Sequence, residues 1–319
     1  MPEYILSSHT LEWEECVCDW CGSNEHDSVF EGPDRLEGLP GTFFLVRCRK
    51  CGTYRQNPRL VWDSLERYYP DNYISYSYAR KDNNNSWVRF IKDYGNIKRR
   101  STIEKYQPGG YLLEIGCGTG GFLRELSKSG KWILTGVEPN ETAVNFARNH
   151  TKANIIRGRI SDIQLKRESF DAIVLWTVIE HLSHPIRDLE YVRSLIKPNG
   201  WIFFSIPNLE SLDAKIFRRY WSGWDLPRHL YLFPRAVVRD VMAFLGFHIV
   251  KERCISTSYA AIGQSLEFWL QEWENKYPRT KYFIKRTYHS WVTRVGLLLP
   301  LAIFDRLNLT STITIIAQK

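Results

Sequence analysis

Four cysteines stand in two short pairs that have metal-ligand spacing. Cys18 and Cys21 form the first CxxC pair, Cys48 and Cys51 form the second, and a glycine follows each pair. Two such turns can present four thiolates tetrahedrally to a Zn²⁺ ion at about 2.3 Å, and the glycine lets backbone amides turn toward the sulfurs. A fifth cysteine, two residues before the first pair, could replace one ligand. Because four thiolates leave no open coordination position, residues 1–60 are predicted to form a structural zinc ribbon.

A second chemical signal is a glycine-dense turn between an apolar segment and a helix-like segment. The stretch LLEIGCGTGG at 112–121 places Gly116, Gly118 and Gly120 where the backbone must bend and approach a ligand closely. Eighteen residues later, a second apolar segment ends at Glu138, whose carboxylate is placed to accept hydrogen bonds from both hydroxyls of a ribose. Loop and acid together predict a nucleotide-like cofactor. The alternative is a doubly wound domain whose glycine turn binds nothing.

The elements that must position these residues follow from the hydrophobic pattern. Short apolar runs alternate with amphipathic segments from 110 to 250, which is typical of βαβ units in a sheet covered on both faces. A β-branched segment near the end predicts one further strand. The sequence therefore predicts an α/β fold with a doubly wound, mostly parallel, seven-stranded sheet. The expected strands are Tyr111–Ile115, Ile133–Val137, Ala153–Ile156, Ala172–Leu175, Trp201–Ile206, Phe247–Glu252 and Thr310–Ala317, and the expected helices are 121–129, 140–150, 185–195 and 234–245.

These motifs, in this order and spacing, resemble class I S-adenosylmethionine-dependent methyltransferases. The resemblance covers roughly residues 110–250 and rests on LLEIGCGTG, GVEPN, FDAIVLWTVIEHL and LIKPNGWIFFSIPN. It implies a Rossmann-like fold and S-adenosylmethionine as cofactor, with Glu114 near the methionine ammonium, the glycine loop around methionine and ribose, and Glu138 on the ribose. The implied cofactor contacts are Glu114, Gly116, Cys117, Gly118, Gly120, Glu138, Pro139, Ile160 and Trp176.

Two positions in this set need comment. Many relatives carry an acid after the third strand that meets the adenine amine, whereas this chain has Arg159 and Ile160 there and Asp162 slightly later. The adenine contact is therefore expected from the backbone alone. The Cys117 side chain, inside the loop, is expected to pack as a small apolar group.

The N-terminal cysteines sharpen the resemblance. A zinc ribbon that leads through CGTYRQNPR and YYPDNY into such a core, followed by WSGWDLPRHLYLF, resembles a bacterial subgroup of zinc-ribbon-bearing class I methyltransferases. This subgroup is often associated with surface-glycan or secondary-metabolite pathways. The resemblance implies a small-molecule acceptor, such as a nucleotide- or lipid-linked sugar, and does not fix its identity.

The candidates for acid–base chemistry follow the later strands. Methyl transfer from a sulfonium is an in-line displacement that mostly needs positioning, and a hydroxyl acceptor also needs a base. His181 and His229 are the best candidates, Asp225 is a third, and Glu180 could orient one of them. The alternative for His181 is packing beneath the cofactor. The aromatic segment 68–78 is expected either to cover the site or to pack.

Composition and charge bound the remaining choices. The chain has 319 residues, is 24% charged and 44% hydrophobic, and carries a formal net charge of +8; its 14% aromatic content argues against general disorder. The longest apolar run, Val295–Phe304, is about half of the ~20 residues that span a bilayer, so an integral membrane protein is excluded. Seven cysteines without a visible export signal indicate a cytoplasmic protein. The predicted divisions are 1–60 zinc ribbon, 61–104 helical linker or lid, 105–256 cofactor-binding core, 257–309 basic and aromatic insertion, and 310–319 final strand.

Three functions remain open at this point. We expect a methyltransferase that modifies a hydroxyl or carbon of a small molecule, such as a sugar or glycan precursor. One alternative is a methyltransferase for ribosomal or transfer RNA whose ribbon grips nucleic acid; the modest charge makes nucleic acid the less favoured partner. Another is a non-catalytic adaptor. Residues 276–304 combine cations with aromatic side chains, so they either contact the inner membrane face peripherally or form a core-packing helix.

Overall fold

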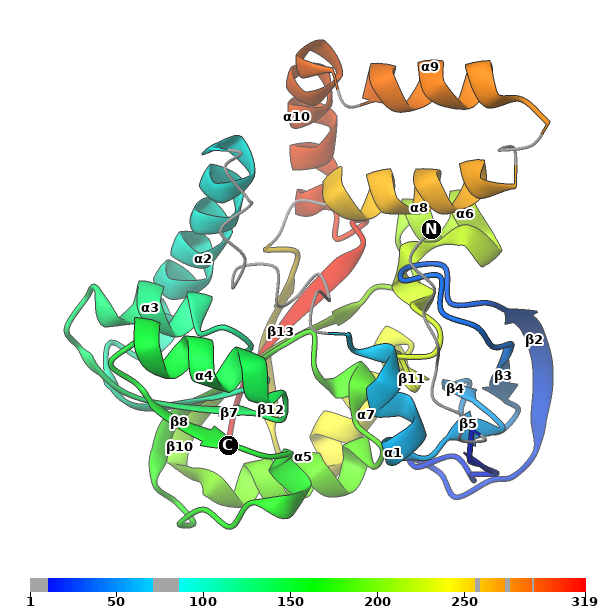
Figure 1. The fold of residues 1–319 in the computed structure, drawn as a ribbon. Coiled ribbons are helices and arrows are strands. Elements are labelled where there is room, and N and C mark those ends of the chain that lie inside the picture. Colours follow the sequence, from blue (N-terminus) through cyan, green and yellow to red (C-terminus); the bar gives the residue numbers. More distant parts are fainter. Residues whose placement is uncertain (1–10, 71–85, 256–258, 273–275, 289) are drawn as a thin grey trace.

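The computed structural model describes residues 11–70, 86–255, 259–272, 276–288 and 290–319. A seven-stranded sheet lies at its centre (Figure 1). Six of its strands run in one direction, and only β13 is antiparallel to its two neighbours, as predicted for a mostly parallel Rossmann-like sheet. In sheet order the strands are β12 (His248–Arg253), β13 (Thr312–Gln318), β10 (Ile196–Pro207), β9 (Phe170–Trp176), β6 (Gly110–Ile115), β7 (Trp132–Glu138) and β8 (Asn154–Arg157).

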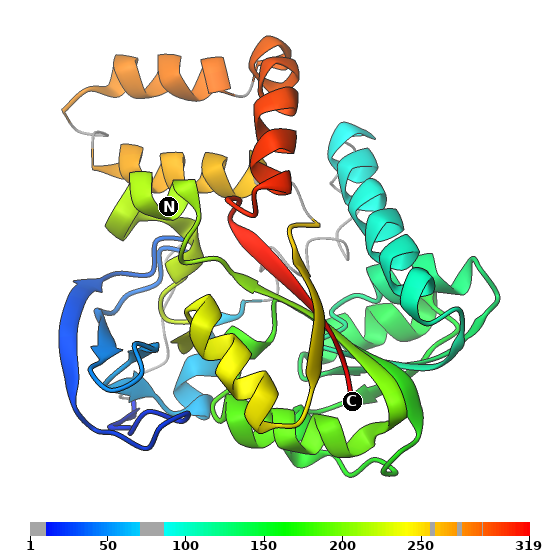
Figure 2. The same cartoon turned by 180° about the vertical axis from the view of Figure 1, so that it is seen from behind.

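Helices cover both faces of this sheet because successive strand side chains point to opposite sides. On β6, Leu112 packs with residues of α2 (Ser86–Tyr106), α3 (Gly121–Ser127) and α4 (Glu141–His150). The next residue, Leu113, belongs to the core under α5 (Pro185–Leu195) and α7 (Arg235–Phe244). Figure 2 shows α7 on the face seen from behind. The sheet is therefore doubly wound, as the alternating pattern predicts.

The N-terminal segment forms a second, four-stranded sheet in the order β11-β4-β3-β2. Three strands come from this segment: β2 (His26–Gly32), β3 (Phe43–Cys48) and β4 (Tyr54–Gln56). The fourth, β11 (Tyr231–Leu232), comes from the long connection after β10 and pairs antiparallel with β4. A short ribbon of β1 (Trp13–Glu14) and β5 (Arg59–Leu60) completes the segment. The cysteine-containing segment and the part of the chain that forms the central sheet are therefore joined by a shared second sheet.

The link to the core begins with α1 (Trp62–Leu65) and the 3-10 turn η1 (Glu66–Tyr68). Leu65 and Tyr68 are buried in the same hydrophobic cluster as residues of the central sheet. Most of the predicted aromatic cover, 71–78, lies outside the described residues.

Three helices stand between β12 and β13, where an insertion is predicted: α8 (Tyr259–Gln271), α9 (Pro278–Tyr288) and α10 (Trp291–Arg306). Figure 1 shows them as a group beyond one end of the sheet, near α6 (Leu212–Phe217). On α9, Tyr282 and Phe283 are exposed. The face of α9 that carries these two residues is therefore not packed into the core. Among the described residues, the helices are all too short or too polar to cross a bilayer.

Candidate active site

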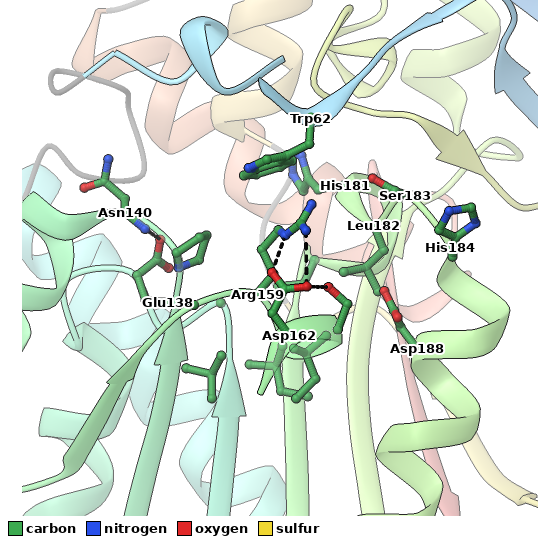
Figure 3. A pocket seen from close by; sticks show the side chains of 18 of the residues that line it. Trp62, Glu138, Asn140, Arg159, Asp162, His181, Leu182, Ser183, His184 and Asp188 are labelled. Carbon is green, nitrogen blue, oxygen red and sulfur yellow. Dashed lines mark hydrogen bonds and ion pairs between the residues drawn. The ribbon is translucent and has the colours of Figure 1, made fainter. Parts of the chain in front are cut away.

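A cavity of about 630 Å³ lies at the carboxyl ends of β6, β7, β8 and β9, under the N-terminal segment. Figure 3 shows Trp62 above it, Glu138 and Asn140 at one side, and His184 at the other. Ligands of open α/β sheets bind at this edge. Of the predicted cofactor residues, six line the cavity: Gly116, Gly118, Glu138, Pro139, Ile160 and Trp176. The other three predicted cofactor residues, Glu114, Cys117 and Gly120, do not line the cavity.

The glycine loop has a shape that other residues could not adopt. Gly116, Gly118 and Gly120 all have positive φ, at 69°, 51° and 72°. A Cβ on Gly116 would lie 2.6 Å from a methyl of Val178, so both conformation and space require glycine there. The Cys117 thiol is buried and packs with α3 and α4, which agrees with its expected packing role.

Glu138 is held at the end of β7 by the loop itself. Its carboxylate accepts hydrogen bonds from the amide of Gly118 at 2.9 Å and from the amide of Asn140 at 3.0 Å. The Asn140 side chain in turn caps α4 by accepting from the amide of Ala143 at 2.9 Å. The carboxylate lines the cavity. Its position is therefore fixed where it can accept hydrogen bonds from two vicinal hydroxyls.

Glu114 presents a buried carboxyl beneath the loop. It is 4% exposed, and its Oε2 has no hydrogen-bond partner among the described residues. Burial raises the pKa of Glu114 to about 8, although the nearby Arg99 guanidinium acts in the opposite direction. An unsatisfied buried carboxyl oxygen is costly unless a donor reaches it. The ammonium group of a methionine moiety is such a donor, so the residues present fit S-adenosylmethionine.

Arg99 is a site residue that sequence reasoning missed. Its guanidinium lies 4.8 Å from the ring centre of Trp176, which lines the cavity, and it is close enough to influence the charge of Glu114. The sequence shows Arg99 only as part of a basic stretch. The packing of α2 beside the glycine loop brings this cation next to Trp176 at the cavity. No local sequence pattern predicts that packing.

The segment after β8 carries the acid that departs from the usual adenine-binding position. Asp162 lines the cavity on the 3-10 turn η3 (Ile160–Asp162), and its carboxylate accepts hydrogen bonds from Arg159 at 2.7 and 3.1 Å. The same guanidinium lies 5.1 Å from the ring centre of Trp62, and Figure 3 shows Trp62 above Arg159. Asp162 is thus engaged by a cation, and the adenine contact through the backbone stays a prediction.

His181 is the predicted base that reaches the cavity. It lies on the 3-10 turn η4 (Ile179–His181), and its Nδ1 is 3.0 Å from the Arg228 carbonyl and 2.9 Å from the Tyr69 hydroxyl. The His229 ring meets it edge to face at 4.6 Å between centroids. Burial lowers the pKa of His181 to about 3 and also lowers the pKa of His229, so both imidazoles are neutral near pH 7.

Asp225 and His229 stand behind His181 and do not line the cavity. The Asp225 carboxylate accepts from the Arg228 guanidinium at 2.7 Å, and Arg228 also binds Asp34 at 2.6 Å. Both partners of the Arg228–Asp34 pair have fully buried side chains. Burial alone would raise the pKa of Asp225, but Arg228 outweighs it and keeps the pKa below its usual value. Asp225 is therefore a permanently charged member of an ion network that joins the N-terminal segment to the 225–231 loop.

The four predicted zinc ligands come together. Sγ of Cys18 lies 3.5 Å from that of Cys51, Sγ of Cys21 lies 3.5 Å from that of Cys48, and all four lie within 4.8 Å of one another. A tetrahedron with Zn–S bonds of about 2.3 Å has S···S edges of about 3.8 Å. Each turn is closed in the same way, by the amide of the following glycine on the carbonyl of the first cysteine. The four thiols thus fit one tetrahedral cation, while the thiol of Cys16 points to the Gln56 carbonyl.

Comparison with known families decides the class of the protein. The family model described as a methyltransferase domain matches residues 85–252, more than half of the chain. The chain belongs to this methyltransferase family. The match spans α2, the glycine loop, Glu138 and the η4 turn, and it ends before the three inserted helices. It does not include the cysteine cluster, nor Trp62 and Tyr69, which line the cavity from the N-terminal segment.

Relatives of this methyltransferase include O-methyltransferases. The ubiquinone biosynthesis O-methyltransferase of Coxiella burnetii (strain RSA 493 / Nine Mile phase I) is 34% identical over 105 residues, which is 31% of this chain and 44% of that protein. The protein with the same description from Hydrogenovibrio crunogenus is 28% identical over 127 residues, 38% of this chain and 48% of that protein. The chain thus spans less than half the length of these curated relatives.

A solved structure supports the fold. The phosphoethanolamine N-methyltransferase 2 of Haemonchus contortus, in complex with S-adenosyl-L-methionine, superposes with a TM-score of 0.50. It is 17% identical, and the superposition covers 83% of this methyltransferase and 62% of that chain. At this identity the likeness confirms the Rossmann-like architecture alone.

Proposed function

We propose that this protein is an S-adenosylmethionine-dependent methyltransferase that acts on a hydroxyl group of a small-molecule acceptor. The observation that carries the proposal is the joint placement of the glycine loop, the fixed carboxylate of Glu138 and the unsatisfied carboxyl of Glu114 around one cavity. The hydrogen-bonded carboxylate of Glu138 suits the hydroxyls of a ribose, whereas the buried, unsatisfied carboxyl of Glu114 suits an ammonium group. The choice of a hydroxyl acceptor is supported by the curated relatives, which are described as O-methyltransferases.

The residues have distinct proposed roles. Glu138 accepts hydrogen bonds from the ribose hydroxyls, Glu114 pairs with the methionine ammonium, and the backbone near Ile160 meets the adenine. The bound cofactor supplies an electrophilic methyl group on a sulfonium sulfur. Positioning of acceptor and methyl group then accounts for most of the rate.

The acceptor is proposed to bind between the loop and the roof of the cavity. Trp62 and Tyr69 reach this space from the N-terminal segment, and His181 reaches it from the core. The aromatic rings offer a flat apolar surface, and the polar ring edge of His181 offers a hydrogen-bond partner for an acceptor hydroxyl. Sugar hydroxyls and aromatic hydroxyls both satisfy this description, so both belong in an acceptor screen.

We further propose that the four thiols hold a structural Zn²⁺. The supporting observation is the matched pair of closed cysteine turns, which leaves no position for a substrate once four sulfurs coordinate. A metal there would stabilise the N-terminal segment, which also carries Trp62 and Tyr69 over the cavity.

Calorimetric titration with S-adenosylmethionine and with S-adenosylhomocysteine tests the first proposal. We expect one site per chain with micromolar affinity, and zinc analysis of the same protein should give one zinc per chain. Radiolabelled methyl transfer to phenolic, catecholic and nucleotide-sugar acceptors would then identify the acceptor class. A folded, zinc-containing protein that binds neither cofactor form would overturn the enzymatic proposal.

A further inference from the structure

Three potential metal ligands, distinct from the four cysteines, meet beside the cavity. Glu180 and His181 are neighbours on η4, and His229 comes from the loop before β11. One donor atom of each lies within 4.8 Å of the donor atoms of the other two. The amide of Leu230 donates to the Glu180 carbonyl at 2.7 Å, so the backbone itself locks the two segments side by side. The cluster is therefore built by the fold and does not depend on mobile surface side chains.

The Glu180 carboxyl lacks a partner. Its residue is 1% exposed, and neither carboxyl oxygen has a hydrogen-bond partner among the described residues. Burying a carboxyl without a hydrogen-bond partner is costly in either protonation state, so natural structures pair it with a donor, a cation or a metal. Arg228, the nearby buried cation, is engaged by Asp34 and Asp225. A cation bound beside Glu180 would therefore supply the partner that its carboxyl group lacks.

The two imidazoles are oriented as metal ligands. Nδ1 of His181 faces the Arg228 carbonyl at 3.0 Å, and Nδ1 of His229 faces the Gly223 carbonyl at 2.8 Å. A carbonyl can only accept, so Nδ1 of His229 donates its proton to Gly223 and its Nε2 keeps a lone pair. Nδ1 of His181 can donate to the Arg228 carbonyl in the same way, with the Tyr69 hydroxyl at 2.9 Å as its second neighbour. This pattern, in which the second nitrogen donates to a backbone oxygen, is the usual support of a metal-bound histidine.

We propose that Glu180, His181 and His229 bind one divalent transition-metal cation of the Mn²⁺, Co²⁺ or Zn²⁺ type. Two imidazole nitrogens and one carboxylate suit these borderline ions better than Mg²⁺, which prefers oxygen ligands. Three protein ligands leave coordination positions open, which is typical of catalytic and not of structural sites. Because His181 lines the cavity, those open positions would face the space proposed for the acceptor.

The role of this cation rests on the proposed function. Coordination of the acceptor hydroxyl would lower its pKa, and its proton would pass to water. The oxygen would then form a bond to the sulfonium methyl carbon as the carbon–sulfur bond breaks, giving a methyl ether, S-adenosylhomocysteine and a proton. Vicinal hydroxyls, which can chelate the metal, should be the preferred acceptors.

Manganese binding to protein that carries a single zinc per chain tests the site, since the four thiols take that Zn²⁺ and leave Mn²⁺ to nitrogen and oxygen ligands. Electron paramagnetic resonance of free Mn²⁺ should show one bound ion per chain, and Co²⁺ should compete for it. Glu180→Gln and His229→Gln should each weaken binding at least tenfold. His184→Gln, on the cavity wall but paired with Asp19 at 3.5 Å, is the matched control and should bind like the parent protein.

Titration of the same preparations with S-adenosylhomocysteine separates the two proposals. Cofactor binding without stoichiometric Mn²⁺ or Co²⁺ binding would overturn the metal site alone. Metal binding without cofactor binding would overturn the proposed function alone. Equal Mn²⁺ affinity of the parent protein and a correctly folded Glu180→Gln variant would also overturn the metal site.

Discussion

Replacing Glu114 by glutamine tests the central electrostatic feature of the cavity. Burial raises the pKa of this carboxyl from 4.5 to about 8. At about 1.4 kcal/mol for each tenfold change in acidity, keeping the side chain charged costs the cofactor-free folded protein about 5 kcal/mol. Near pH 7 the carboxyl should therefore be mostly protonated until a cationic ligand arrives.

The sign of the stability change follows from proton linkage. Because the folded-state pKa lies above the unfolded value, the folded protein binds more protons between pH 4.5 and about 8. The free energy of unfolding must fall as pH rises through that window. Glu114→Gln has no such titration, so relative to the parent protein it should gain up to about 5 kcal/mol between pH 5 and pH 9. Glu180, whose burial also raises its pKa to about 8, is common to both proteins and cancels in the difference.

Cofactor affinity should respond in the opposite sense. If the ammonium group requires the ionised carboxyl, the dissociation constant of S-adenosylhomocysteine should fall by up to tenfold per pH unit between pH 6 and 8. The Glu114→Gln variant should bind S-adenosylhomocysteine more weakly than the parent protein at pH 8, and its affinity should be nearly independent of pH. Calorimetric titration at three pH values, with urea unfolding of the same proteins, measures both effects. A parent protein whose cofactor affinity does not change over this range would refute the reasoning.

Three further variants test other parts of the structure. Glu138→Ala removes the proposed acceptor of two charge-assisted hydrogen bonds from the ribose and should raise the cofactor dissociation constant at least ~100-fold by calorimetry; a change below about threefold contradicts our placement of the ribose. Cys48→Ser should abolish the proposed zinc binding and lower the melting temperature, and retention of full zinc would contradict the four-thiol site. Arg228→Leu leaves two buried carboxylates unpaired and should cost about 3–5 kcal/mol in urea unfolding. Arg49→Ala is its control, because the pair with Asp27 is exposed and should contribute less than about 1 kcal/mol.

Much of the fold could be predicted from local sequence signals. The apolar runs place all seven strands of the central sheet to within a few residues, because strands buried on both faces need continuous apolar stretches. The end of β7 at Glu138 and the loop before α3 follow from an acid and three glycines, whose types are dictated by backbone geometry. Gly246 ends α7 as a positive-φ residue, again a local requirement.

The remaining features depend on contacts between distant segments. Trp62 and Tyr69 roof the cavity only because the N-terminal segment packs over the core, and neither residue type reveals that position. The two-residue strand β11 is too short to have a periodicity. Glu180 looks like a possible orienter in the sequence, but its burial without a hydrogen-bond partner among the described residues emerges only from the folded structure. Side-chain pairs far apart in the chain were the least predictable part.

The shared sheet also limits how this protein can be taken apart. β11 pairs with β4, and the Gln56 side-chain amide donates to the carbonyls of Pro227 at 2.8 Å and His229 at 2.7 Å. Residues 1–60 are therefore not an independent domain. A core expressed without them would expose the edge of β11 that pairs with β4 and loosen the loop that carries His229. A graft of the cysteine segment onto another methyltransferase would arrive lacking one strand. Experiments that exchange domains between methyltransferases should therefore move the N-terminal segment and the β11 loop together.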